Sequence, residues 1–313
     1  MCGDRMRALT ADGAGELVPA EVERPVVGAN QVLVAVRASS ANFGEIMDVV
    51  PTAPHGFVPG WEAVGTVLET GCGTTRLRPG DLVATLGFAG GWAEYRVVDE
   101  ELAFRLPSDS SPAAMAVVGV AGGTAIRAIR RLGSTLGVRV MVTGAASAVG
   151  FFTIQLLAKA GACVVAVDPK VERHSRHREL GAAETLVTPE ENGEPLGAVV
   201  DTVGGSVLVH AFRQLRAHGR LIAVGHTARE QETFQVGDLE GGSGRHGRVI
   251  ETMHLLQDDL RRTLVDDIEW LARLVNDGDV LIPDTVVRGF SSFASSATLK
   301  SRSGGWVKTV LEL

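Results

Sequence analysis

The stretch from Val138 to Asp168 constrains the possible fold of this chain more than any other. A β-branched run at 138–142 leads into a turn of small residues, Gly144 to Gly150, and an apolar helix follows. A second apolar strand, Cys163 to Val167, ends at the acid Asp168. This order of strand, small-residue turn, helix, strand and acid is typical of a dinucleotide-binding βαβ unit.

The chemistry of this turn suits a nucleotide. Small residues let backbone N–H groups approach a pyrophosphate, and the start of the helix adds a favourable dipole for the anion. A G-x-G-x-x-G pattern would have glycine where Ala146 stands, so an ordinary packing turn is the alternative. We assign cofactor binding to the whole turn, which comprises Gly144, Ala145, Ala146, Ser147, Ala148, Val149 and Gly150.

Composition narrows the class of protein. The chain has 313 residues, 45% hydrophobic and 21% charged, which fits a globular protein with two domains. A net charge of −7 argues against nucleic acid or an anionic membrane as the main partner. Apolar runs look too short to span a bilayer, and the N-terminus lacks the apolar core of a secretory signal. We therefore expect a cytoplasmic protein.

The cysteines indicate neither a disulfide framework nor a zinc site. Cys2, Cys72 and Cys163 are scattered and include no C-x-x-C pair. This usage excludes a four-cysteine zinc site and argues against structural disulfides.

The rest of the chain divides into two kinds of sequence. Residues 6–105 read as short strands separated by turns, which predicts a compact barrel or sandwich, with strands at 32–36, 63–68, 82–84 and 92–98. After the polar break at 107–112 we predict helices at 113–121 and 124–132. Strands and helices then alternate from residue 138, as in a doubly wound parallel sheet. We also predict a mobile loop at 228–247, a helix at 260–276 and a strand at 307–311.

Several motifs recur in a characteristic order. They are QVLV at 31–34, NFGE at 42–45, VPGWEAVG at 58–65, PGDLV at 79–83, GWAEY at 91–95, GTA at 123–125, the 144–150 turn and ELGA at 179–182. Together they resemble the medium-chain dehydrogenase/reductase superfamily, specifically its zinc-independent quinone oxidoreductase and enoyl reductase branch. The resemblance covers nearly the whole chain.

The resemblance implies an α/β fold with two domains. A GroES-like β-barrel catalytic domain would comprise residues 1–112, completed by residues 250–313. A Rossmann domain with a doubly wound parallel sheet would comprise residues 113–249. The resemblance also implies hydride transfer from a nicotinamide cofactor, NADPH or NADH, to a small-molecule substrate. Since relatives are commonly dimers or tetramers, we expect a homodimer.

The chain departs from the zinc-dependent members of that superfamily. In those relatives a cysteine and the histidine of Gly-His-Glu bind the catalytic metal. Here the loop around Asn42 has no cysteine and Trp61 stands at the histidine position. An indole cannot ligate zinc, so we expect no metal. Without a Lewis acid, the hydride acceptor should stabilise its own anion, as a quinone or an α,β-unsaturated carbonyl does.

Residues near these motifs are candidates for the chemistry. Asn42 matches the asparagine of the quinone oxidoreductase loop, and it would bind cofactor ribose or substrate unless it only caps its loop. His55 is the nearest candidate proton donor, with an ordinary surface histidine as the alternative. Glu45 stands where this branch often carries an acid. Aromatic side chains that would line a substrate pocket, or else pack in the core, are Phe43, Trp61, Phe88 and Trp92.

The remaining candidates concern the cofactor. Thr124 matches a threonine that meets the nicotinamide amide in relatives, although it could instead cap its helix. Gly225 ends a later apolar strand and is assigned to the same site. Asp168 aligns with the acid that binds the adenosine diol in NAD-dependent relatives and would repel a 2′-phosphate. Lys170 and Arg173 lie just beyond it and could pair with that phosphate, so the choice between NADPH and NADH stays open.

The sequence therefore predicts a zinc-independent, NAD(P)H-dependent reductase of a quinone or an α,β-unsaturated carbonyl. A first alternative is a metal-free carbonyl reductase or alcohol dehydrogenase for a secondary metabolite. A second is a protein that binds NAD(P)H as a redox sensor without turnover.

Overall fold

The computed structural model describes residues 4–242, 244–256, 261–294 and 307–313. Two compact units make up the chain: Met1–Gly123 with Asp259–Leu313, here called the split unit, and Thr124–Asp258, here called the central unit. The helical residues predicted at 113–121 therefore lie in the split unit. The boundaries fall after Gly123 and Asp258 instead of after residues 112 and 249. Cys2 lies outside the described residues.

The split unit is built on a sheet that joins both ends of the chain. Its strand order is β14-β15-β3-β4-β5-β7, with β6 also paired to β3. The C-terminal strand β15 pairs antiparallel with β3, Val310 opposite Ser40, so the C-terminal segment completes the N-terminal sheet. The strands are β3 (Gln31–Ser40), β4 (Glu62–Thr70), β5 (Leu82–Leu86), β6 (Tyr95–Asp99), β7 (Ala103–Arg105), β14 (Thr285–Gly289) and β15 (Lys308–Glu312). A separate hairpin pairs β1 (Arg5–Ala11) with β2 (Leu17–Glu23).

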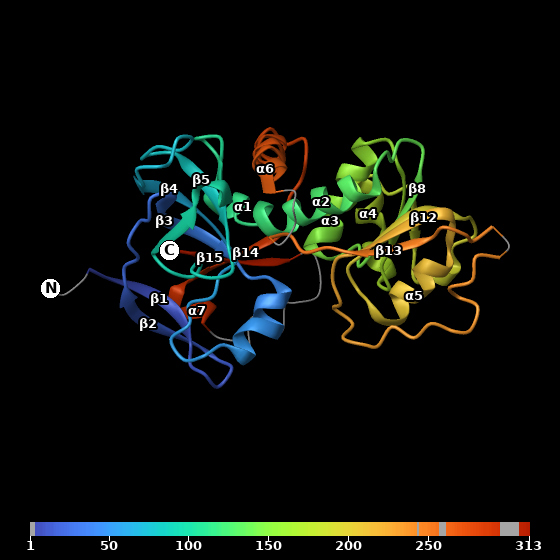
Figure 1. Ribbon diagram of the computed structural model, residues 1–313, viewed down its shortest axis with the longest axis horizontal. Helices are drawn as coiled ribbons and strands as arrows, with labels where there is room; N and C mark the ends of the chain where they lie inside the picture. The colour runs from blue at the N-terminus through green and yellow to red at the C-terminus, as the bar shows by residue number, and fades with distance from the viewer. Residues whose placement is uncertain (1–3, 243, 257–260, 295–306) are drawn as a thin grey trace. The chain divides into compact units, whose positions relative to one another are not determined.

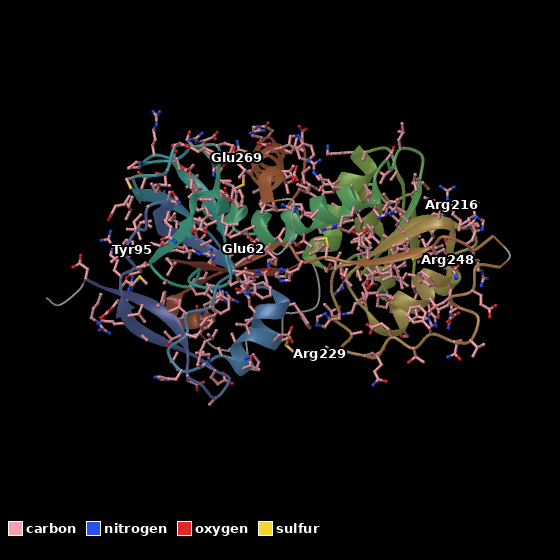
Figure 2. All side chains as sticks on the ribbon, in the orientation of Figure 1. Glu62, Tyr95, Arg216, Arg229, Arg248 and Glu269 are labelled. Atoms are coloured by element: carbon pink, nitrogen blue, oxygen red, sulfur yellow. The ribbon has the colours of Figure 1, made fainter. Side chains whose placement is uncertain are left out.

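Helices of the split unit are short except for one. The helix predicted at 113–121 is instead α1 (Pro112–Met115) followed by a π-helical turn, Val118–Gly122. The other helical segments are a π-helical turn (Glu45–Val49), 3-10 turns (Val50–Thr52 and Glu100–Leu102), α6 (Arg261–Asn276) and α7 (Phe290–Phe293). Buried Leu264, Ile268 and Leu271 form the inner face of α6, as its apolar spacing predicts. Glu269, labelled in Figure 2, ties α6 to the loop between β4 and β5 through an ion pair with Arg76, 2.9 Å long.

The central unit is a six-stranded sheet in the order β10-β9-β8-β11-β12-β13. Every neighbouring pair is parallel, and Figure 1 shows β12 and β13 side by side. Its elements are α2 (Gly123–Leu132), β8 (Arg139–Thr143), α3 (Ala148–Lys159), β9 (Cys163–Val167), a 3-10 turn (Val171–Arg173), α4 (His174–Glu179), β10 (Glu184–Leu186), a 3-10 turn (Pro189–Glu191), β11 (Leu196–Asp201), α5 (Gly205–Arg213), β12 (Leu215–Ala223) and β13 (Val249–Thr252). This order is the doubly wound arrangement that the sequence predicts, with its direction reversing between β8 and β11.

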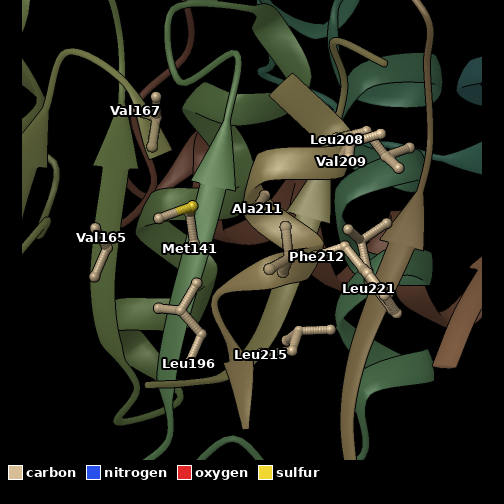
Figure 3. Packing of buried hydrophobic residues seen from close by; sticks show 11 residues of the cluster. Met141, Val165, Val167, Leu196, Leu208, Val209, Ala211, Phe212, Leu215 and Leu221 are labelled. Atoms are coloured by element: carbon tan, nitrogen blue, oxygen red, sulfur yellow. The ribbon is translucent and has the colours of Figure 1, made fainter. Parts of the chain in front are cut away.

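Helices cover both faces of the central sheet because its strands are apolar on both sides. On one face α5 supplies Leu208, Val209, Ala211 and Phe212, which pack against strand residues that include Met141, Val165 and Leu221 (Figure 3). On the other face Ala128 of α2 packs against Val200 and Ile222. The side chains of the neighbouring residues Val199 and Val200 of β11 thus pack on opposite faces of the sheet, as the two-residue period of a strand requires.

One helical stretch differs from the expectation that apolar runs are too short to span a membrane. Residues Pro112–Leu132 are long and apolar enough by length and composition alone. Because 72% of the most apolar window is buried inside the protein, this stretch has the character of a core helix.

The predicted loop at 228–247 consists of turns in its described part. It is fastened at Asp238, whose carboxylate receives two hydrogen bonds of 2.7 and 2.8 Å from the Arg213 guanidinium. The mobility of this loop stays a prediction.

Candidate functional site

The small-residue turn lies at the point where the strand order of the central unit reverses. It follows β8, and the next strand across the reversal is β11. Gly144 has φ +61°, and a Cβ there would lie 2.1 Å from Thr202 Oγ1. A Cβ on Gly150 would lie 2.5 Å from the Gly144 carbonyl oxygen. Both glycines are therefore required by geometry, one for the left-handed turn and one for the close approach of α3.

Helix α3 begins inside the predicted turn, at Ala148, with Ser147 as its N-cap. The Ser147 hydroxyl accepts a hydrogen bond of 2.9 Å from the Gly150 N–H. Ala145 and Ala146 are buried, whereas Ser147, Ala148 and Val149 are half-buried. The start of α3 thus lies at the carboxyl end of β8, where open α/β sheets bind anionic ligands.

Replacing Ser147 with alanine is expected to lower the free energy of unfolding by about 1 kcal/mol, since it removes an N-cap acceptor. Ser111→Ala is the matched control. Ser111 caps the four-residue helix α1 with a bond of 3.5 Å, and its loss should cost less than about 0.5 kcal/mol. Urea denaturation of both variants measures the difference, and equal losses would contradict the assignment.

A buried polar brace joins the ends of β8 and β11, and sequence reasoning did not find it. Asp201 has no exposed surface; it accepts hydrogen bonds from the Thr143 hydroxyl and, at 2.8 Å, from the Gly204 N–H. Burial raises the pKa of Asp201 against the opposing effect of these bonds. The Thr202 hydroxyl donates to the Thr143 carbonyl at 3.1 Å. A Cβ on Gly225 would lie 3.0 Å from the Thr202 carbonyl oxygen, so Gly225 lies beside this brace.

Asp168 follows β9 as predicted, but its side chain turns inward. The residue is 2% exposed, and its carboxylate accepts hydrogen bonds from the Lys170 N–H at 3.0 Å and from His177 Nε2 at 2.9 Å. Arg173 Nη1 lies 3.9 Å from the same carboxylate. Asp168 is thus already bonded within the chain, and its role toward a cofactor stays a prediction.

Thr124 is the second residue of α2 and is 8% exposed. Because α2 begins at Gly123 and continues directly from a π-helical turn, Thr124 is not the N-cap of this helix. Its contact with a nicotinamide stays a prediction.

In the split unit, four polar side chains form a buried network at the start of β4. It comprises Asn42, Glu45, Glu62 (labelled in Figure 2) and Lys308, each at most 8% exposed. Asn42 Nδ2 donates to Glu45 Oε2 at 2.9 Å and to Glu62 Oε1 at 3.0 Å. Lys308 Nζ donates to Asn42 Oδ1 at 2.7 Å and lies 3.8 Å from Glu62 Oε1. Both N–H groups of the Asn42 amide and one lone pair of its oxygen are therefore used within the chain.

Backbone groups complete the network. The N–H groups of Trp61 and Asn42 donate to Glu45, and the Val120 N–H donates to Glu62 at 2.8 Å. The loop after β3, the strands β4 and β15 and the π-helical turn at 118–122 thus meet at these carboxylates.

Burial dominates the ionisation of this network. It raises the pKa of Glu45 to about 7, although hydrogen bonds from Asn42 and Trp61 favour the ionised form. Burial likewise lowers the pKa of Lys308, opposed by the charges of Glu62 and Glu45. Arg96 is also buried, which lowers its pKa to about 10. The network thus combines two buried acids, Glu45 and Glu62, with the buried charges of Lys308 and Arg96.

The predicted aromatic residues occupy different environments. Phe43 and Trp61 are half-buried, and the Trp61 ring lies so close to Gly44 that a Cβ there would be 2.6 Å from it. Phe88 is 53% exposed. Trp92 has no exposed surface and packs edge-on against Phe293, ring centroids 5.2 Å apart. Trp92 is therefore packed in the core of the split unit, and a substrate pocket lined by these side chains stays a prediction.

The predicted proton donor and the nearby tyrosine both have structural partners. His55 is exposed, and its Nδ1 donates to the Asp12 carbonyl at 3.2 Å. Tyr95 lies under the Arg24 guanidinium, 4.6 Å from its ring centroid. Neither belongs to the network of Asn42, and a catalytic role for His55 stays a prediction.

The residues at the family's metal position do not suit a metal ion. Asn42 uses its side-chain oxygen on a Lys308 ammonium, and the indole of Trp61 offers no lone pair to a metal. Within residues 4–242, 244–256, 261–294 and 307–313, no group of three or more His, Cys, Asp or Glu could hold a metal. The turn of the central unit, in contrast, has the small residues and helix start that suit a dinucleotide.

Comparisons with known proteins give two family matches along the chain. Residues 28–108 match the model of the alcohol dehydrogenase GroES-like domain, and residues 148–264 match that of the zinc-binding dehydrogenase. The chain is 31% identical over 242 residues to quinone oxidoreductase-like protein 2 of Bos taurus, covering 72% of this chain and 69% of that protein. Its homologue in Nematostella vectensis is 31% identical over 65% of this chain and 60% of its own length.

Two further comparisons give a sequence relative with a different name and a solved structure. Acryloyl-coenzyme A reductase of Metallosphaera sedula is 25% identical over 66% of this chain and 72% of that protein. The solved structure of a quinone oxidoreductase from Coxiella burnetii superposes with a TM-score of 0.82, covering 99% of this chain and 100% of that chain at 21% identity.

The chain spans only about three-fifths of the length of the Nematostella and mouse relatives, 60% and 63%. The family itself is shown by the bovine match, and the fold by the Coxiella structure. The chain therefore belongs to the medium-chain dehydrogenase/reductase superfamily and is similar to its quinone oxidoreductase-like and enoyl reductase members.

Proposed function

We propose that this protein transfers hydride from NAD(P)H to a quinone or to an α,β-unsaturated carbonyl compound. The observation that carries the proposal is the turn at Gly144–Gly150, which lies at the reversal of a parallel sheet and leads into the capped helix α3. Such a turn suits the pyrophosphate of a dinucleotide. When bound, the nicotinamide supplies the hydride.

Residues of the central unit would hold the cofactor. Backbone N–H groups of Ala148 and Val149 at the start of α3 would face the pyrophosphate, because those of Ser147 and Gly150 already donate to the Gly144 carbonyl and to the Ser147 hydroxyl. The brace of Thr143, Asp201 and Thr202 holds the ends of the paired strands β8 and β11 together, so the backbone beside the turn would be preorganised for the cofactor.

The substrate class follows from the residues at the family's metal position. Trp61 stands where zinc-dependent relatives have a metal-binding histidine, and the loop around Asn42 has no cysteine. Lys308 supplies a buried positive charge beside Asn42. This ammonium already donates to Asn42 and Ala41, and unlike a metal ion it offers no coordination position to a carbonyl oxygen. An acceptor that delocalises its own negative charge suits this arrangement. The names of two relatives, quinone oxidoreductase-like protein 2 homolog and acryloyl-coenzyme A reductase, refer to acceptors of this kind.

The test begins with purified protein in a buffer with a metal chelator. NADPH and NADH are titrated separately while nicotinamide fluorescence is recorded, and then oxidation of the bound cofactor is followed with a quinone, an enoyl thioester and a saturated ketone. We expect binding, with turnover of the quinone or the enoyl thioester in the presence of chelator. Turnover of the ketone alone would indicate a carbonyl reductase, and binding without turnover a redox sensor. Failure of both dinucleotides to bind would overturn the proposal.

We also propose a homodimer in the cytoplasm without nucleic-acid or membrane partners. Strand β13 ends the central sheet and exposes Val249 and Ile250 by 38% and 37%. An exposed apolar edge strand of this kind supports pairing with a second copy.

A further inference from the structure

We infer that His177 is a specificity-determining residue, which holds the Asp168 carboxylate away from the cofactor and thereby favours a dinucleotide with a 2′-phosphate. The inference rests on the proposed function, since it concerns the adenosine end of the same cofactor site. It answers a question that the sequence leaves open, because Asp168 favours NADH whereas Lys170 and Arg173 favour NADPH.

The first step is the set of bonds on the Asp168 carboxylate. Oδ1 accepts from the Lys170 N–H at 3.0 Å, a local turn typical of aspartate. Oδ2 accepts from His177 Nε2 at 2.9 Å, so this imidazole carries its proton on Nε2 or on both nitrogens. Arg173 Nη1 adds a positive charge 3.9 Å from Oδ2. Each carboxylate oxygen thus has a donor from the chain itself.

The second step is the rigidity of the arrangement. His174 and His177 stand three residues apart on α4 and therefore share a face of the helix. His174 Nε2 donates to the Asp168 carbonyl at 2.8 Å, while His177 binds the side chain. Both imidazoles are buried, with His177 0% exposed. One short helix therefore fixes both the backbone and the carboxylate of Asp168.

The third step is access. A ribose 2′,3′-diol must reach the carboxylate to be recognised by it, but the Asp168 side chain is only 3% exposed. Burial by itself would raise the pKa of Asp168, yet the hydrogen bonds from His177 and Lys170 and the nearby positive charges hold it below its usual value. The acid is therefore ionised, neutralised locally and withdrawn from the ribose.

The fourth step concerns the basic side chains that stay accessible after the end of β9. Lys170 is exposed, and Arg173 keeps 21% of its side chain exposed. Arg176 is paired with Glu179 at 3.0 Å. With Asp168 held inward, Lys170 and the exposed part of Arg173, which also lies 3.9 Å from Asp168, offer positive charge that would attract a 2′-phosphate. Removing the His177 donor would leave a buried carboxylate short of a hydrogen bond, which favours its rotation toward solvent.

The experiment measures the dissociation constants of NADPH and NADH by nicotinamide fluorescence in the wild type, His177→Leu, His177→Gln and Ser175→Ala. We expect the wild type to prefer NADPH, and His177→Leu to shift the affinity ratio toward NADH by about tenfold, the effect of one strong hydrogen bond. His177→Gln keeps a side-chain N–H and should restore most of the preference. Ser175→Ala, at an exposed position on the same helix, should leave the ratio unchanged.

A double variant separates this device from a general disturbance of α4. In His177→Leu with Asp168→Asn, the gain for NADH should disappear, because the released carboxylate that would bind the diol is gone. An unchanged ratio in His177→Leu, while both dinucleotides still bind, would overturn the inference and leave the proposed function intact. A wild-type preference for NADH that Asp168→Asn abolishes would also overturn it. If neither dinucleotide binds to the wild type, the proposed function fails and this inference with it.

Discussion

Replacing Lys308 with methionine is expected to lower the free energy of unfolding by about 3–5 kcal/mol, the usual cost of removing one partner from a buried ion pair. The Lys308 ammonium donates to Asn42 Oδ1 and to the Ala41 carbonyl, and it lies 3.8 Å from Glu62. Methionine fills a similar volume but donates no hydrogen bond. Glu62 would then be buried without the nearby ammonium, and Asn42 Oδ1 would lose its hydrogen bond from Lys308. Urea denaturation followed by circular dichroism measures the loss.

Two variants control for this result. Lys308→Arg keeps the positive charge and should lose less than the methionine variant. Arg5→Ala removes one partner of the pair Arg5–Glu21, whose side chains are 53% and 68% exposed, and exposed pairs contribute at most about 1 kcal/mol. Equal losses in Lys308→Met and Arg5→Ala would show that the buried network contributes no more than an ion pair at the surface.

The strands and helices of the central unit could be predicted because their signals are local. The strand at 163–167 has the same bounds in the structure, since a run of apolar β-branched residues is bounded by Gly161 and Asp168. Parallel pairing followed from the alternation of strands with helices. Strand β13 was missed because its residues 249–252 follow a glycine-rich stretch and lie at a sheet edge, half out of the core.

Changes within a helix or at the start of a strand were harder to predict from the sequence. An apolar run at 113–121 indicates a helix, but not that it changes from α to π at Val118. That change brings the Val120 N–H to Glu62, 58 residues away in sequence. Likewise, strand β6 begins at Tyr95 and not at Trp92, because the backbone of Trp92 bonds to Pro59 and Leu9 and does not pair with β3.

The candidate site shows the same limit more strongly. A turn motif identified Gly144 and Gly150, because the positive φ of Gly144 and the close approach of Gly150 to the Gly144 carbonyl are features of the turn itself. No spacing rule links Asn42 to Lys308, which are 266 residues apart. Nor does any motif link Asp168 to His177, since a histidine on a charged helix reads as a surface residue. In both cases the tertiary structure decides which partner a polar side chain meets.

The carboxylate of Glu45 provides the second large effect, which depends on pH. Glu45 is fully buried, and burial raises its pKa from 4.5 to about 7 in the folded protein. In the unfolded chain this carboxyl should ionise near its ordinary value of about 4.3. Between these two values the folded protein holds a proton that the unfolded chain has lost. The contribution of Glu45 to stability is therefore greatest below about pH 4.3 and decreases as the pH rises to about 7.

The Glu45→Gln variant is expected to gain stability relative to the wild type by about 3 kcal/mol between pH 4.5 and pH 8, because glutamine does not ionise and one pKa unit corresponds to about 1.4 kcal/mol. Any constant packing difference cancels when the two proteins are compared at both pH values by urea denaturation. Glu69→Gln is the matched control, since Glu69 is 58% exposed and paired with Arg24. Its difference from the wild type should change by less than about 1 kcal/mol across the same range. Parallel curves for Glu45→Gln and the wild type would mean that Glu45 stays ionised in the folded protein, held by the N–H groups of Trp61 and Asn42 despite its burial.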